Sequence, residues 1–253
     1  MKPGDALPPN PDVWIIACRD DRHAASEAAR TLLDAFVLDG ERDFALALSG
    51  GRIAPILGSE LARQAELRNT PFAEADFFWA DERCVRPDHP ESNYRVAKTS
   101  LLDRLAVAPA RIHRLLGELP PDQAVIRANA DWAQWAERRG PQREVLDCVL
   151  LGVGEDGHVA SLFPDNLPSD LVSTLPFHSV VGPKPPPQRL TLGYPMLWNA
   201  RRVIVLATGD GKAAVVRDSL AGRLESPLAR VLHGRIGKPT VVITHAPPAT
   251  HRP

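Results

Sequence analysis

A histidine and an acid stand close together in a glycine-rich run of this chain. Residues 150–164 read LLGVGEDGHVASLFP, so Asp156 comes two positions before His158 and Gly157 lies between them. A histidine beside a carboxylate has the parts of a general base with an orienting partner. The alternative is a glycine-rich turn with a solvated acid and histidine. A short motif alone does not decide between the two.

The segment before this run predicts where it lies. Residues 145–151 are mostly apolar and typical of a buried strand, and glycines follow directly at 152 and 154. Glycine lets a ligand approach the backbone closely. In open α/β sheets, ligands bind beyond the carboxyl ends of the strands. We therefore expect Gly157 and His158 at a ligand-binding rim of a sheet.

A second motif suits an anion. Ser49, Gly50, Gly51 and Arg52 join the apolar strand-like segment 44–48 to a predicted helix. Successive backbone N–H groups at a helix start bind phosphate well, and an arginine adds charge-assisted hydrogen bonds. The pattern is neither GxxxxGK[ST] nor GxGxxG, so it does not indicate nucleotide binding. The alternative is an ordinary strand-to-helix turn.

A third motif places two acids beside an arginine. Asp81, Glu82 and Arg83 follow the third predicted strand and are able to hold sugar hydroxyls or orient a water molecule. The alternative is a solvated loop with a surface ion pair, which contributes little to stability. Ser92 and Asn93 have a sufficient structural role as helix N-cap residues.

Three further cations complete the candidate site. Lys212 stands at the start of a predicted helix, where its charge opposes the helix dipole unless an anion is bound. Lys184 belongs to the proline-rich stretch 182–187, which predicts a stiff connection. Arg189 follows at a strand start, where a surface cation is the alternative. Together, the motifs predict a pocket for a phosphorylated, hydroxyl-rich small molecule.

The remaining pattern predicts one α/β domain with a doubly wound, mostly parallel sheet and helices on both faces. We expect flexible tails at 1–12 and 246–253 around a single domain at 13–245. Apolar periodicity predicts strands at 13–18, 44–48, 76–79, 145–151, 190–192, 203–207 and 240–244. It predicts helices at 20–38, 53–67, 93–105, 122–138 and 212–220.

Composition narrows the class of partner. The chain has 253 residues and a net charge of -1, so it shows no excess of positive charge for binding nucleic acid or an anionic membrane.

The three cysteines of the chain form no CxxC pair, which argues against a disulfide framework or structural zinc. We expect Cys18 and Cys148 in the core and Cys84 partly exposed. The sequence has no signal-peptide or membrane-spanning pattern, so we expect a cytoplasmic protein. We also expect a monomer.

These motifs resemble the glucosamine-6-phosphate isomerase/6-phosphogluconolactonase family, over about residues 13–244. The resemblance rests on the runs LSGG at 48–51, DER at 81–83 with Ser92 and Asn93, and GVGEDGH at 152–158, with TG at 208–209 and KA at 212–213. The runs SLFP at 161–164 and PKPPPQRLTL at 183–192 resemble the lactonases of this family.

The resemblance implies hydrolysis of 6-phospho-D-glucono-1,5-lactone to 6-phosphogluconate, with no cofactor and no metal. It makes His158 the general base that activates water and Asp156 a partner that positions the histidine or the substrate. The resemblance also implies substrate-binding roles, in contact with the phosphate or the sugar, for Ser49, Gly50, Gly51, Arg52, Asp81, Glu82, Arg83, Gly157, Lys184, Arg189 and Lys212.

The chain departs from the family pattern in two places. The phosphate loop usually continues with a small polar residue and Thr-Pro, whereas this chain has Arg52, Ile53, Ala54 and Pro55. A glycine common after SLFP is replaced by Asp165. The lost hydroxyl changes the loop contacts, and Arg52 is able to compensate. We interpret His178 as a surface loop histidine and not as a second base.

Two other functions stay open at this point. A deaminase or isomerase of the same family would use the pocket with Asp81 as its base. A sugar-phosphate sensor without catalysis is the other alternative. Sensors in transcriptional regulators carry a DNA-binding segment before the sensor domain, and no helix-turn-helix fits in residues 1–12.

Overall fold

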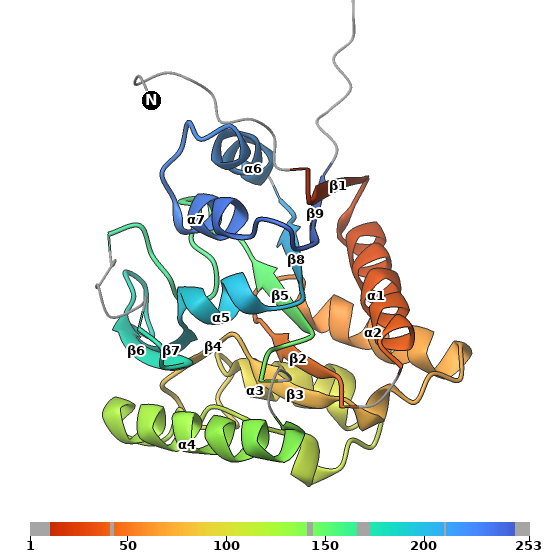
Figure 1. Ribbon diagram of the computed structural model, residues 1–253, viewed down its shortest axis with the longest axis vertical. Helices are drawn as coiled ribbons and strands as arrows, with labels where there is room; N and C mark the ends of the chain where they lie inside the picture. The colour runs from red at the N-terminus through yellow and green to blue at the C-terminus, as the bar shows by residue number, and fades with distance from the viewer. Residues whose placement is uncertain (1–10, 41–42, 141–143, 166–172, 210, 246–253) are drawn as a thin grey trace, which may run out of the picture.

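A six-stranded parallel sheet forms the centre of the computed structural model, which describes residues 11–40, 43–140, 144–165, 173–209 and 211–245 (Figure 1). All neighbouring strands in it run parallel. The predicted doubly wound sheet is therefore confirmed. In spatial order its strands are β1 (Val13–Cys18), β9 (Thr240–His245), β8 (Arg202–Ala207), β5 (Cys148–Gly152), β2 (Ala45–Leu48) and β3 (Asp76–Trp79).

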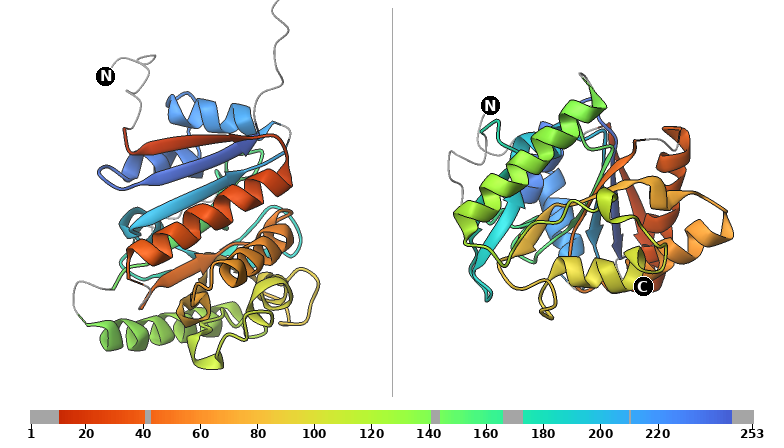
Figure 2. Two further views of the ribbon diagram at one scale, coloured as in Figure 1. Left: turned by 90° about the vertical axis from the view of Figure 1, so that its right-hand side faces the viewer. Right: turned by 90° about the horizontal axis from the view of Figure 1, so that it is seen from below.

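Helices cover both faces of this sheet, as Figures 1 and 2 show. On one face α1 packs against α2, and on the other α5, α6 and α7 lie together. None of the helices in the described ranges is long and apolar enough to cross a membrane. The helices are α1 (Asp21–Leu38), α2 (Ala54–Leu67), α3 (Asn93–Ala97), α4 (Pro121–Arg139), α5 (Tyr194–Asn199), α6 (Lys212–Leu220) and α7 (Pro227–Gly234).

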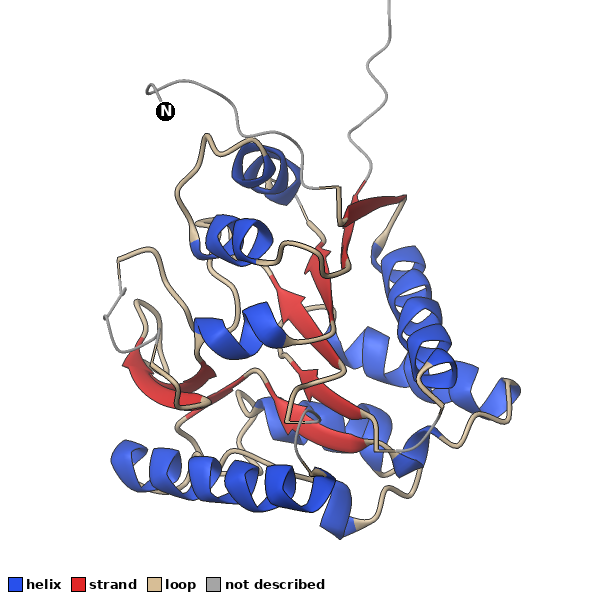
Figure 3. Cartoon of the chain, viewed as in Figure 1, coloured by secondary structure: helices blue, strands red, loops and turns tan. Residues whose placement is uncertain are grey.

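A second, antiparallel sheet differs from the sequence expectation (Figure 3). It consists of β4 (Asp81–Arg83), β7 (Gln188–Leu192) and β6 (Phe177–Val181) in that order. The predicted strand at 190–192 belongs here because the proline-rich stretch 182–187 reverses the chain between β6 and β7. The prediction for His178 is wrong: it lies buried on β6, with Nε2 2.9 Å from the Leu175 carbonyl oxygen.

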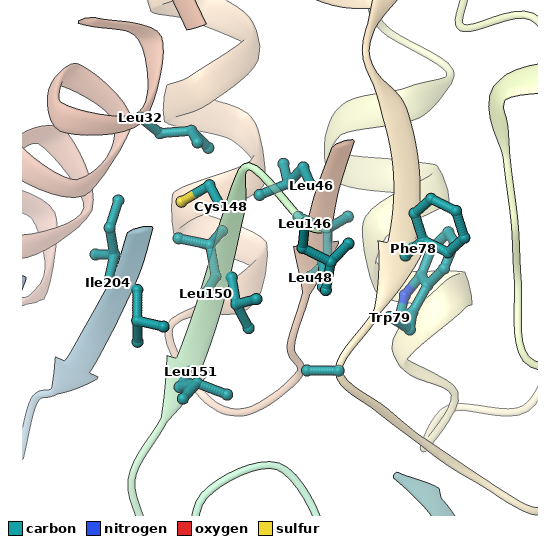
Figure 4. Close-up of a cluster of buried hydrophobic side chains, with 14 of the residues drawn as sticks. Leu32, Leu46, Leu48, Phe78, Trp79, Leu146, Cys148, Leu150, Leu151 and Ile204 are labelled. Atoms are coloured by element: carbon teal, nitrogen blue, oxygen red, sulfur yellow. The ribbon is translucent and has the colours of Figure 1, made fainter. Parts of the chain in front are cut away.

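Buried apolar side chains fill the space between the sheet and its helices. Leu46 and Leu48 of β2 lie next to Leu150 of β5, with Ile204 of β8 beyond (Figure 4). Strands covered on both faces read as continuous apolar runs, which is why these segments were recognisable. The expectations for the cysteines are confirmed. Cys18 and Cys148 are buried and Cys84 is partly exposed.

Helix starts follow the expected cap chemistry. Asp20 caps α1 by accepting a hydrogen bond from the His23 N–H at 2.7 Å, and Ser92 caps α3 through the Arg95 N–H at 3.2 Å. The predicted helix 93–105 is shorter and irregular, because α3 passes at Lys98 into a π-helical turn that ends at Leu102. The predicted tails lie largely outside the described residues. Asp12, which is described, accepts a hydrogen bond from the Gly237 N–H at 2.7 Å.

A buried histidine joins α4 to the edge of the parallel sheet. The His113 ring stacks on Phe78, with centroids 4.4 Å apart. Its Nδ1 lies 2.9 Å from Asp131 of α4, and its Nε2 lies 3.8 Å from Asp76 of β3. Burial lowers the pKa of His113, but the two carboxylates outweigh that effect and raise it above 6.5.

This raised pKa makes part of the protein's stability pH-dependent. A histidine with a raised folded-state pKa stabilises the fold fully below its unfolded pKa and loses that effect as pH rises through the folded pKa. We expect His113→Gln to remove the part of the decrease in unfolding free energy that occurs as pH rises from 6.5 through the folded-state pKa of His113. Urea unfolding across that range measures it, with the exposed His89→Gln as control. An unchanged pH slope in His113→Gln would contradict the assignment.

Candidate active site

Strand register places the sequence motifs at one edge of the parallel sheet. Leu48 of β2 pairs with Trp79 of β3, and Gly152 of β5 pairs with Leu206 of β8. The segments that follow these strands therefore meet and surround a pocket of about 600 Å³, open mouth included, which suits a small molecule. Its lining consists of Ser49, Gly50, Gly51, Arg52, Ile53, Asp81, Arg83, Asn93, Gly152, Val153, His158, Ala160, Arg189, Leu206, Thr208 and Lys212.

The loop after β2 is held against its neighbours. The Ser49 hydroxyl donates to the Leu150 carbonyl oxygen at 2.7 Å, which fixes the loop to β5. Gly50 lies directly against Asn93: a β-carbon at position 50 would stand 1.8 Å from Asn93 Oδ1. Only glycine permits that approach. The loop then leads into α2, whose N-terminal end favours an anion.

A chain of polar side chains holds Asp81 at the wall of the pocket. Asp81 is only 5% exposed, and its two carboxylate oxygens accept hydrogen bonds from Ser161 Oγ at 2.8 Å and Asn93 Nδ2 at 3.2 Å. The same Asn93 amide donates to the Asp81 carbonyl oxygen at 2.8 Å. The solvated-loop alternative for this motif therefore does not apply to Asp81.

Glu82 points away from the pocket because side chains alternate along β4. It is 2% exposed, and its carboxylate accepts four hydrogen bonds, from the backbone N–H groups of Arg83, Asn93 and Tyr94 and from Ser92 Oγ. Burial raises the pKa of the Glu82 carboxyl, and these hydrogen bonds oppose the rise. Its observed contacts attach the start of α3 to β4.

His158 and Asp156 form a hydrogen-bonded pair at the pocket. His158 Nδ1 lies 2.6 Å from Asp156 Oδ1, which also accepts from the His158 backbone N–H at 3.1 Å. Burial disfavours the charged form of Asp156, but the hydrogen bonds from His158 outweigh it and lower the pKa of Asp156. An ionised Asp156 accepts a hydrogen bond from Nδ1–H and leaves Nε2 as the basic nitrogen.

Two of the four pocket cations have carboxylate partners. Arg52 is bonded through both terminal nitrogens to Asp21, with Nη2 3.1 Å from Oδ1. Arg83 Nη1 donates to the Glu91 carboxylate at 3.1 Å and to the Glu91 carbonyl oxygen at 2.7 Å. The charges of these two arginines are therefore largely offset.

Arg189 and Lys212 have no carboxylate partner among the described residues. Buried Arg189 donates to the carbonyl oxygens of Pro186 and Lys184 at 3.2 and 3.3 Å. Burial, and then repulsion from Arg83, lowers its pKa. Burial, and then repulsion from Arg52, likewise lowers the pKa of Lys212. The pocket thus carries excess positive charge, which an anionic ligand would neutralise.

Four of the predicted site residues do not line the pocket. Asp156 reaches it only through His158, and Glu82 faces α3. The Gly157 carbonyl oxygen accepts from the Leu228 N–H of α7 at 3.0 Å. The Lys184 side chain is exposed, and only its carbonyl contacts Arg189.

Sequence reasoning missed two polar residues of the lining, Asn93 and Thr208. The sequence predicts a helix-cap role for Asn93, and its contact with Gly50 is visible only in the folded structure. Thr208 stands directly before a glycine at the end of β8, which was the available signal.

The fold and pocket define an α/β protein with a cationic small-molecule site at the carboxyl ends of its parallel strands. A family model described as glucosamine-6-phosphate isomerases/6-phosphogluconolactonase matches residues 19–241. The chain belongs to this family.

Curated relatives agree with this membership, and a solved structure shares the fold. Human 6-phosphogluconolactonase is 40% identical over 75% of this chain and 73% of its own length. The bovine 6-phosphogluconolactonase is 37% identical over 81% and 78%. A solved structure of 6-phosphogluconolactonase from Trypanosoma cruzi shares the fold with a TM-score of 0.78 at 23% identity, over 95% of each chain.

Lys212 and Lys184 are both predicted from the sequence as substrate-binding residues, but they should differ in their effect on anion affinity. We expect Lys212→Ala to weaken binding of inorganic phosphate about tenfold, because it removes a pocket cation that has no carboxylate partner among the described residues. Lys184→Ala makes the same charge change outside the pocket and should leave binding unchanged. Phosphate-dependent thermal stabilisation or calorimetry measures both. Equal effects of the two variants would place the anion elsewhere.

Proposed function

We propose that this protein hydrolyses 6-phospho-D-glucono-1,5-lactone to 6-phosphogluconate, as in the oxidative pentose phosphate route. The observation that carries the proposal is the His158–Asp156 pair at a pocket with two unneutralised cations. Family membership and the names of the human and bovine relatives support it. The proposed route uses only the protein's side chains and water, with no cofactor or metal.

In the proposed mechanism His158 is the general base. Asp156 accepts the hydrogen bond from Nδ1–H, so Nε2 takes a proton from water as the water oxygen attacks the lactone carbonyl carbon. The attack gives a tetrahedral intermediate with a negatively charged oxygen. When the intermediate collapses, the bond from this carbon to the ring oxygen breaks and the proton on His158 passes to that oxygen. The product is the open-chain acid.

We assign the pocket cations by the elements that carry them. Arg189 lies over the Phe163 ring, 5.6 Å from its centroid, and the His158 ring contacts the same phenyl group at 4.9 Å between centroids. Arg189 pairs with Arg83 across β4 and β7, so both are placed to stabilise the oxyanion that develops beside His158. Lys212 and Arg52, with the loop 49–51, are then left for the phosphate.

The alternative base, Asp81, is less suited to proton transfer from a substrate. Both of its carboxylate oxygens already accept hydrogen bonds from Ser161 and Asn93. His158 Nε2 has no hydrogen-bond partner in the described part of the chain, which leaves it available to a water molecule. This difference favours lactone hydrolysis over the deaminase or isomerase reaction.

Replacing the base should remove most of the activity. We expect His158→Asn to lower kcat for lactone hydrolysis at least about a hundredfold, because general-base catalysis contributes about that much or more. Asp156→Asn should also lower kcat, because it removes the carboxylate that orients the ring and keeps Nε2 the basic nitrogen. A stopped assay with freshly made lactone, corrected for spontaneous opening, measures both.

Two results would overturn the proposal. Full activity in His158→Asn would remove the assigned base. Ammonia release from glucosamine 6-phosphate by the unaltered protein, without lactone hydrolysis, would assign the deaminase reaction instead. The exposed His89→Asn serves as a control for the loss of a histidine outside the site.

A further inference from the structure

Arg52 stands where the family pattern has a small polar residue, and its side chain is 62% exposed. A free arginine there would sample many rotamers and would contact a phosphate only part of the time. Its terminal nitrogens instead bond both carboxylate oxygens of Asp21, in the first turn of α1. This paired geometry fixes the plane of the guanidinium group.

Asp21 also lies next to residues at the carboxyl ends of β8 and β9. His245, at the end of β9, places Nε2 3.3 Å from Asp21 Oδ1, and its Nδ1 accepts the Gly209 N–H at 3.3 Å. Burial opposes ionisation of Asp21, but the contacts with Arg52, Thr208 and His245 outweigh it and lower the pKa of Asp21. Asp21 therefore remains an anion that accepts the hydrogen bonds from Arg52.

The side chains of Arg52 and Lys212 both come close to Gly209. A β-carbon at this position, where φ is +114°, would stand 3.3 Å from Arg52 Nη2 and 4.0 Å from Lys212 Cε. Both side chains also line the pocket. Arg52 and Lys212 thus both lie close to one small residue, where a single anion is able to contact both, and we call this pair the anion clamp.

We propose that Asp21 is a positioning residue that fixes Arg52 for binding the phosphate group of the substrate together with Lys212. His245 lies beside the same carboxylate and accepts a hydrogen bond from the Gly209 N–H. This inference rests on the proposed function, since it assigns the phosphate end of the same pocket. It makes Asp21 a determinant of selectivity for phosphorylated lactones, although Asp21 does not line the pocket.

Simple electrostatics predicts the opposite effect, so the sign of the result is decisive. Asp21 is a negative charge near an anion site, and its removal should tighten anion binding if charge alone mattered. The paired Arg52 charge offsets that repulsion, and solvent and salt screen the remainder around the exposed guanidinium group. The hydrogen bonds from a guanidinium group to phosphate, in contrast, require a fixed orientation. Positioning therefore outweighs repulsion in this proposal.

The first experiment compares two lactones. We expect Asp21→Asn to raise KM for 6-phosphogluconolactone about tenfold with little change in kcat, and to leave hydrolysis of unphosphorylated glucono-1,5-lactone unchanged. Asp34→Asn makes the same charge change on the exposed side of the same helix and should have no effect. Equal losses with both lactones would show a general structural effect and overturn the proposal.

The second experiment needs no enzymatic activity. Calorimetric titration with inorganic phosphate should show about tenfold weaker binding by Asp21→Asn than by the unaltered protein. In an Arg52→Ala background, Asp21→Asn should cause no further loss, because Asp21 acts through Arg52. Tighter phosphate binding by Asp21→Asn, or losses that add in the double variant, would overturn the positioning role.

The two proposals fail in distinguishable ways. If the unaltered protein does not hydrolyse the lactone but binds phosphate in an Asp21-dependent manner, the proposed reaction fails and the clamp stands. If it hydrolyses the lactone and Asp21→Asn changes neither KM nor phosphate binding, only the clamp fails. Thermal unfolding of each variant checks that the fold is retained.

Discussion

The buried carboxylate of Glu82 is the constraint on which the geometry of the pocket depends. It accepts four hydrogen bonds from β4 and the start of α3, and it is closed to solvent. Because side chains alternate along a strand, Glu82 facing α3 turns Asp81 and Arg83 the other way. A carboxylate buried this deeply is costly unless its oxygens are bonded, so its partners are held firmly in place.

Ala80 connects this constraint to the rest of the fold. Its N–H donates to the Leu48 carbonyl oxygen of β2 at 2.7 Å, and its own carbonyl oxygen accepts the Leu192 N–H of β7 at 2.8 Å. The chain thus passes from the parallel to the antiparallel sheet within one residue. The pocket lies at this junction, where segments that follow the parallel strands and residues of β4 and β7 contribute to its wall.

The sequence allowed the parallel sheet and most of the pocket lining to be predicted, for a physical reason. Apolar strands covered on both faces are visible as continuous runs, and parallel strands end at one edge. The motifs after β2, β3, β5 and β8 therefore had to meet. The antiparallel sheet, the burial of His178 and the contact of Gly50 with Asn93 depend on pairings between distant segments, which periodicity does not reveal. The same holds for Arg52 and Asp21, which are 31 residues apart.

The two sheets supply cations to the pocket in different ways. Arg52 comes from the loop after β2 and Lys212 from the first turn of α6, whereas Arg83 and Arg189 face each other across β4 and β7. The segment with His158 bridges them, because Ser161 donates to Asp81 at 2.8 Å through its hydroxyl and to Thr191 Oγ at 3.2 Å through its N–H. His158 thus follows β5 of the parallel sheet, and the loop that contains it is attached to the antiparallel sheet through Ser161. Any shift between the two sheets would move His158, the proposed base, relative to Lys212 at the proposed phosphate site. The hydrogen bonds at Ala80, Glu82 and Ser161 therefore set the distance between these two sites.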